Sequence, residues 1–207
     1  MYVPHFNVME EADVVGFLAA HPAGHLVTVG PDGRPDVTLL PLVLDEGRVL
    51  AHLARANEHW RRITSGSSGL LVVTAADAYI SPSWYASKRE HGRVVPTWNY
   101  SEVQLSGQVT VHDDEAFVRD VVTRLTERHE AHRSRPWGVT DAPERYIAGQ
   151  LRAVVGVELR VESVSAKAKL SQNRSRADRE GAIAGLEAEP GSSSHDVARA
   201  MRAALGD

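Results

Sequence analysis

The stretch Leu26–Leu53, LVTVGPDGRPDVTLLPLVLDEGRVLAHL, decides the fold class. Its apolar runs, each short enough for one strand, occupy residues 26–29, 37–44 and 49–53. Two turn signals separate these runs, Pro31-Asp32-Gly33 and Asp45-Glu46-Gly47. Turns this short leave no room for the crossover helix that parallel strands need. The stretch therefore predicts an antiparallel meander that opens a sheet or a barrel.

The rest of the chain adds strands and helices to this meander. Further strands are predicted at residues 69–74, 103–111 and 155–161. Helices are predicted at residues 9–20 and 58–64, after a cap at Asp113, and after Asp141. Together these elements predict a mainly β protein with helices, of the α+β class, built on a small antiparallel barrel.

The composition changes after about Ser175, where alanine, arginine and acidic residues dominate. Two short helical patterns follow, separated by a segment rich in proline, glycine and serine. We therefore predict a barrel domain over residues 1–175 and a helical C-terminal appendage over residues 176–207.

Composition excludes several classes of chemistry. The chain has 207 residues, no cysteine and a formal net charge of −4. Without cysteine there is no disulfide framework, iron–sulfur cluster or thiolate catalysis, and no metal site is expected. No secretory signal and no long apolar run stand out, so we expect a cytoplasmic protein with no membrane partner. The small negative charge gives no overall field that would attract nucleic acid.

Four short clusters combine aromatic rings, cations and amides, and they occupy residues 52–60, 79–85, 96–100 and 167–174. The first runs from a strand end into a helix start and offers a guanidinium and an amide for an anionic group. Any single aromatic residue is better explained as core or dimer contact. Taken together, the clusters indicate a pocket for a planar, hydrogen-bonding, phosphorylated ligand.

These clusters, in this order, resemble the FMN-binding negative transcriptional regulator family of the PaiB type. The resemblance covers about residues 1–176. The matching segments are Met1–Pro4, Thr38–Leu42, His52–Trp60, Ala78–Tyr85, Val95–Tyr100 and Lys169–Asn173. The chain departs from the family at Leu39, where members often carry histidine, and at Glu58, where they usually carry proline.

The resemblance implies a bacterial FMN-binding split β-barrel, similar to pyridoxamine-phosphate oxidases. It also implies a homodimer with the flavin in a groove between the subunits. By analogy, His52, Arg55 and Asn57 would meet the phosphate, with Lys169 as a second cation. The full set of implied FMN-binding residues is Thr38, Pro41, His52, Arg55, Asn57, Trp60, Trp84, Thr97, Trp98, Asn99, Lys169, Gln172 and Asn173.

Three functions remain open from the sequence. The first is an FMN-binding regulator, with DNA as a partner that the charge supports only weakly. The second is a flavin-dependent oxidoreductase that acts on a small substrate and does not bind DNA. The third is a barrel that has lost flavin binding or takes haem or a deazaflavin. No residue stands out as a general acid or base, so catalytic residues are not assigned and it stays open whether the protein is an enzyme.

Overall fold

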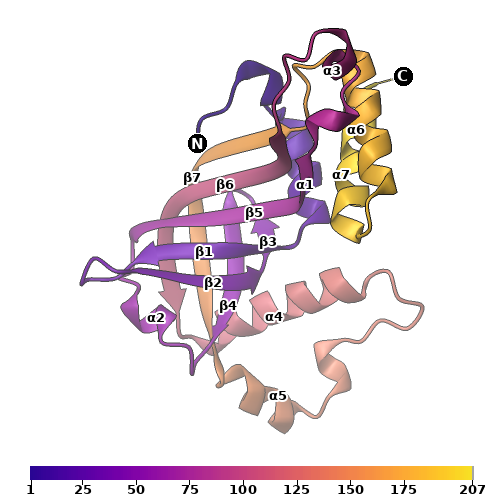
Figure 1. Cartoon of the computed structure of the whole chain (residues 1–207). Helices are drawn as coiled ribbons and strands as arrows, with labels where there is room; N and C mark the ends of the chain where they lie inside the picture. Colours follow the sequence, from indigo (N-terminus) through magenta and orange to yellow (C-terminus); the bar gives the residue numbers. More distant parts are fainter. Residues whose placement is uncertain (207) are drawn as a thin grey trace. The chain divides into compact units, whose positions relative to one another are not determined.

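A computed structural model describes residues 1–206. Its strands form one seven-stranded sheet with the order β2-β1-β5-β6-β7-β4-β3 (Figure 1). The strands are β1 Ala23–Val29, β2 Pro35–Pro41, β3 Val43–Asp45, β4 Arg48–Ala54, β5 Ser67–Ile80, β6 Thr97–His112 and β7 Val154–Lys169. The pairings of β1 with β2 and β5, and of β4 with β3 and β7, are antiparallel. The predicted α+β class is confirmed.

Helices precede, separate and follow these strands. They are α1 Glu11–Ala20, α2 His59–Arg62, α3 Ser87–Glu90, α4 Glu115–Glu130, α5 Glu144–Leu151, α6 Arg176–Ala188 and α7 Ser192–Ala203. Short 3-10 turns occur at η1 His5–Asn7, η2 Pro82–Trp84 and η3 Val139–Asp141. In the part of the chain that the structure describes, no helix is both long and apolar enough to cross a membrane.

The predicted meander is wrong at one point. The run 37–44 is not a single strand, because β2 ends at Pro41 and β3 begins at Val43. The two pieces lie at opposite ends of the strand order, each in its own hairpin. Pro41 has no N–H for a ladder, and the N–H of Leu42 donates instead to the carbonyl of Pro22 at 2.9 Å. The chain therefore leaves one hairpin and starts another where the sequence reads as continuous.

Contacts divide the chain into two compact units, and the long strands β5, β6 and β7 contribute to both. The first unit consists of Met1–Ala19, Thr74–Val103 and the chain from Ser165 onward. The second unit consists of Ala20–Val73 and Gln104–Val164. Each unit has its own buried core.

The second unit's core includes a cluster between α4 and the β3–β4 hairpin. Val121 and Leu125 of α4 pack there against Val43 and Leu50. The helix begins after Asp114, whose side chain accepts from the N–H of Phe117 at 2.8 Å. The cap is therefore Asp114, one residue later than the predicted Asp113. The Asp113 side chain is left to make a contact elsewhere.

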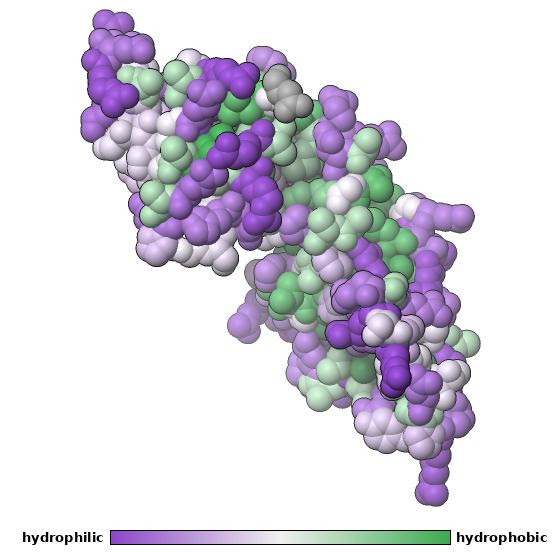
Figure 2. Space-filling model, turned by 90° about the vertical axis from the view of Figure 1, so that its right-hand side faces the viewer, coloured by the Kyte–Doolittle hydropathy of each residue, from purple (hydrophilic) through white to green (hydrophobic). Residues whose placement is uncertain are grey.

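The first unit's core joins β5 to α6 and α7, which lie side by side (Figure 1). Its buried side chains are Ala78, Ile80, Tyr85, Leu170, Ala182, Ile183, Leu186, Val197, Ala198 and Met201. The described part of the expected appendage, residues 176–206, therefore shares a core with the strands, and Asp207 lies outside the described residues. Apolar side chains also reach the surface, as the green areas of Figure 2 show.

Candidate functional site

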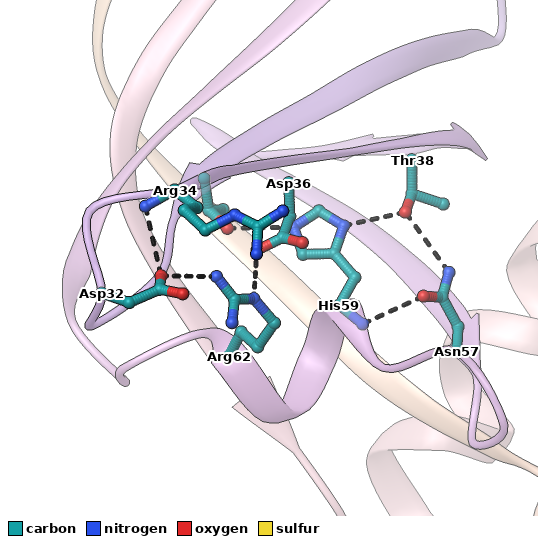
Figure 3. Close-up of polar contacts among 8 residues, drawn as sticks. Asp32, Arg34, Asp36, Thr38, Asn57, His59 and Arg62 are labelled. Atoms are coloured by element: carbon teal, nitrogen blue, oxygen red, sulfur yellow. Dashed lines mark hydrogen bonds and ion pairs between the residues drawn. The ribbon is translucent and has the colours of Figure 1, made fainter.

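A polar cluster in the second unit surrounds His59, the first residue of α2 (Figure 3). His59 is buried, with Nδ1 at 2.8 Å from Oγ1 of Thr38 and Nε2 at 2.9 Å from Oγ1 of Thr28. Asn57 accepts from the His59 N–H at 3.0 Å and donates to Thr38 at 3.3 Å. Burial lowers the pKa of His59, which favours the neutral ring. The cluster thus ties the loop before α2 to strands β1 and β2.

Arg62 forms the outer part of this cluster. Its guanidinium donates to Asp32 and to Asp36, both at 2.6 Å (Figure 3). Hydrogen bonds to these two carboxylates raise the pKa of Arg62. Arg62 thus holds the hairpin turn against α2. Because two carboxylates already neutralise its guanidinium, Arg62 is poorly suited to bind an anionic ligand.

Arg55, the predicted phosphate residue, is also paired. Its Nη1 donates to Oδ2 of Asp113 at 3.1 Å, and its Nε donates to the Arg152 carbonyl at 2.8 Å. The indole N–H of Trp60 donates to the Arg55 carbonyl at 2.9 Å. The hydrogen bond from Arg55 lowers the pKa of Asp113, which keeps that carboxylate charged. The loop therefore brings Arg55, Asn57 and Trp60 together, but its cation faces a carboxylate.

The structure also places three other residues of this unit that the sequence singled out, His52, Pro41 and Glu58. His52 is half-buried on β4, and its Nδ1 is buried without a hydrogen-bond partner among the described residues. Burial lowers the pKa of His52. Pro41 is exposed at the end of β2, and Glu58 pairs with Arg61 at 2.6 Å.

The first unit contains a cavity of about 310 Å³ beside the start of β6 and the end of β7. It is lined by Tyr2, Pro4, Phe6, Asn7, Val95, Pro96, Thr97, Asn99, Tyr100, Lys167, Lys169, Ser171, Asn173 and Arg174. Four predicted FMN-binding residues, Thr97, Asn99, Lys169 and Asn173, are therefore brought together here. Tyr2, Pro4, Phe6 and Asn7 form a wall of the cavity that is not among the implied FMN-binding residues, and the match of Met1–Pro4 to the family is the one sequence signal that pointed to it.

The charged residues that line this cavity are all cations. Lys167, Lys169 and Arg174 line it, no lining residue is acidic, and none of the three makes an ion pair within residues 1–206. The Lys169 ammonium donates to Oγ1 of Thr97 at 2.6 Å. Burial lowers the pKa of Lys169, so an anion beside it would offset that cost. Such a cluster is suited to an anionic ligand.

Hydrogen bonds hold the loop that follows β7 and forms one wall of the cavity. Gln172 accepts from the N–H of Leu170 at 2.7 Å and donates to the Ala168 carbonyl at 2.6 Å. Asn99 is buried and donates to Oγ of Ser171 at 3.0 Å, where the backbone is left-handed with φ of 63°. Gln172 and Asn99 therefore shape this wall, and their side-chain donors are used within the protein.

Trp84 and Trp98, two of the implied FMN-binding residues, do not line the cavity. Trp84 packs against α6, where a Cβ on Gly185 would lie 2.2 Å from its ring. Trp98 is 49% exposed, and its indole N–H donates to Asp77 at 2.8 Å. Trp84 therefore belongs to the core, and Trp98 forms a surface pair with Tyr79 at a ring distance of 6.3 Å.

Solved structures with the same fold define the class of protein. A conserved hypothetical protein from Mycobacterium tuberculosis aligns with a TM-score of 0.58 and 16% identity, over 84% of this chain and 92% of the other. A FAD and heme binding protein from Mycobacterium smegmatis aligns with a TM-score of 0.58 and 16% identity, over 80% of this chain and 74% of the other. The chain thus has the split-barrel fold of flavin-binding proteins, as predicted.

Sequence comparison then identifies the family. A family model described as "Putative FMN-binding domain" matches residues 1–163. The protein named "Protease synthase and sporulation protein PAI 2" from Bacillus subtilis is 31% identical over 206 residues, which are 97% of this chain and 96% of that protein. The chain belongs to this PaiB-type family, and the family's cofactor is FMN.

The family extends to fungi. An uncharacterized protein from Aspergillus fumigatus is 40% identical over 124 residues, which are 53% of this chain and 48% of that protein. The alignment therefore covers about half of each chain.

Proposed function

We propose that this chain binds FMN in the cationic cavity of the first unit and carries out flavin redox chemistry on a small molecule. The observation that carries the proposal is the set of three cations, Lys167, Lys169 and Arg174, in a cavity where none of the described lining residues is a carboxylate. In the second unit, by contrast, Arg55 and Arg62 are each balanced by aspartate. A phosphate dianion is therefore better matched by the first unit.

The residues of the cavity fit the polar part of FMN. The ammonium groups and the guanidinium match the phosphate, while Thr97 and Asn173 offer a hydroxyl and an amide for the ribityl chain. At about 310 Å³ the cavity is small for a cofactor pocket, so it would hold the phosphate end of the flavin. Bound FMN would supply the electron transfer, while the chain binds and orients it.

An apolar surface on β1 and β2 supports a homodimer. Val29, Val37 and Leu39 are 55%, 60% and 58% exposed, and Pro35 and Pro41 are exposed on the same strand. Side chains alternate along β2, so Thr38 faces His59 while Leu39 faces outward. A sheet face of exposed valine, leucine and proline is typical of a surface covered by a second subunit.

The alternative is a negative transcriptional regulator that binds DNA directly. The Bacillus relative's name connects that protein with protease synthesis and sporulation. On α6 and α7, however, three of the four arginines are paired with acids: Arg176 with Glu180, Arg199 with Asp196 and Arg202 with Glu187. The fourth, Arg179, donates to the Ala204 carbonyl at 2.7 Å. A helix pair whose cations are mostly balanced in this way offers little positive charge to phosphate backbones. We therefore favour a small-molecule flavoprotein.

The test is to purify the protein, remove any bound flavin and titrate it with FMN while recording absorption and fluorescence. We expect saturable binding of one FMN per protomer and a dimer in solution. Absence of binding up to high micromolar FMN would contradict the proposal. A mobility shift on DNA from its own promoter, weakening with salt, would instead favour the regulator.

A further inference from the structure

The segment Met1–Val8, which we name the strap, lies against the end of β7. Val8 forms an isolated antiparallel bridge with Lys167. The Lys167 ammonium also donates to the Tyr2 carbonyl at 3.2 Å, and the N–H of Asn7 donates to the Pro4 carbonyl at 2.8 Å. One residue of β7 thus holds the strap at two points, through its backbone and through its side chain.

The strap is also a wall of the cationic cavity. Tyr2, Pro4, Phe6 and Asn7 line it together with residues from β6, from the end of β7 and from the loop after β7. Lys167 is both a cavity cation and the residue that binds the strap. A phosphate held by Lys167 would therefore lie within one side chain's reach of the strap backbone.

The strap is attached by few buried contacts. Tyr2 is 82% exposed, Met1 and Val8 are also exposed, and Asn7 is the strap's one buried side chain. The attachment of the strap therefore depends mainly on the Val8 bridge to Lys167 and on the hydrogen bond from the Lys167 ammonium to the Tyr2 carbonyl.

We infer that the strap makes the cavity selective for a flavin that ends in a single phosphate, which is FMN, against FAD. This inference rests on the proposed function. FAD continues from the same phosphate into a second phosphate and an adenosine. With the first phosphate at Lys167 and Lys169, an extension that leaves the cavity past Lys167 would meet the strap, because the Lys167 ammonium contacts the Tyr2 carbonyl and Tyr2, Phe6 and Asn7 line the cavity. FMN requires no such space, so the strap penalises only the longer ligand.

The experiment compares the dissociation constants of FMN and FAD for the intact chain and for a chain that starts at Val8 behind an initiator methionine. We expect the intact chain to prefer FMN by about 100-fold, corresponding to about 2.7 kcal/mol. Removal of the strap should reduce that preference below about tenfold, mainly because FAD binds more tightly. Flavin fluorescence quenching reports both constants without requiring activity.

Two further variants keep the comparison interpretable. If the shortened chain does not fold, the double variant Tyr2→Ala and Phe6→Ala opens the same wall and should also narrow the preference. Val15→Ala on the exposed face of α1 is the control and should leave it unchanged.

The outcomes separate the two proposals. An intact chain that binds neither flavin refutes FMN binding and the strap's role with it. An intact chain that binds FMN and FAD equally well, or a preference that survives both strap variants, overturns the strap's role alone.

Discussion

Replacing Lys169 by methionine removes one charge from the cavity while keeping a side chain of similar length. The Lys169 ammonium lies 2.6 Å from Oγ1 of Thr97, and no carboxylate of residues 1–206 lines the cavity. A charge-assisted hydrogen bond to phosphate contributes about 1.5–3 kcal/mol. We therefore expect Lys169→Met to weaken FMN binding by about 10- to 150-fold.

Riboflavin makes this test specific, because it has the same ring and ribityl chain but no phosphate. Its dissociation constant should change by less than about threefold in Lys169→Met, since the lost contact is to phosphate. Lys88→Met is the matched control, because Lys88 donates to Ser83 at 2.9 Å and does not line the cavity. Titrations at one low salt concentration, monitored by flavin fluorescence, measure the dissociation constants of FMN and riboflavin for each variant.

The competing site gives the result that would refute this reasoning. From sequence alone, Arg55 is the leading phosphate residue, but its guanidinium is hydrogen-bonded to Asp113 and to the Arg152 carbonyl. We expect Arg55→Ala to change the FMN dissociation constant by less than about threefold. A tenfold loss in Arg55→Ala with none in Lys169→Met would move the phosphate to the loop before α2.

Three other changes test the dimer surface, the buried histidine and the α6 packing. Leu39→Asp, on the exposed apolar face, should convert a dimer into monomers in sedimentation or light scattering, and an unchanged mass would exclude this face. Because burial lowers the pKa of His59 below the usual histidine value of about 6.5, the unfolded chain takes up its proton first as the pH falls below that value. Stability should then fall by up to about 1.4 kcal/mol per pH unit in urea unfolding, and His59→Gln should flatten this slope. Gly185→Ala places a Cβ 2.2 Å from the Trp84 ring and should destabilise the folded protein by about 1–3 kcal/mol. Gly16→Ala on α1, where a Cβ would have nothing within 4 Å, is the control and should stabilise it by about 0.5–1 kcal/mol. Equal shifts of the unfolding temperature in the two variants would contradict the α6 packing.

Local patterns were sufficient for most of the elements. The turn at Asp45-Glu46-Gly47 is a hairpin, with left-handed φ values of 44° at Glu46 and 82° at Gly47, as expected where glycine follows an acidic turn residue. Aspartate before α4 provides the cap, one residue from its predicted place. Such features depend on neighbours in the chain, and neighbours are what a sequence states directly.

The break after Pro41 shows where local patterns stop being sufficient. Residues 37–44 are apolar apart from Thr38, and the division between β2 and β3 comes from the carbonyl of Pro22 and from two separate strand partners. Hydrophobic periodicity reports that a segment is buried, but it does not report which strand lies beside it.

The sequence by itself determined the fold class, the family and the four clusters that carry polar and aromatic residues. The tertiary structure decided which cations remain available. Arg55 meets Asp113 across 58 residues of chain, whereas Lys169 meets the Thr97 hydroxyl across 72 residues and has no ion pair among the described residues. A cation's capacity for a ligand depends on its nearest opposite charge, and that distance is set by folding rather than by spacing along the chain.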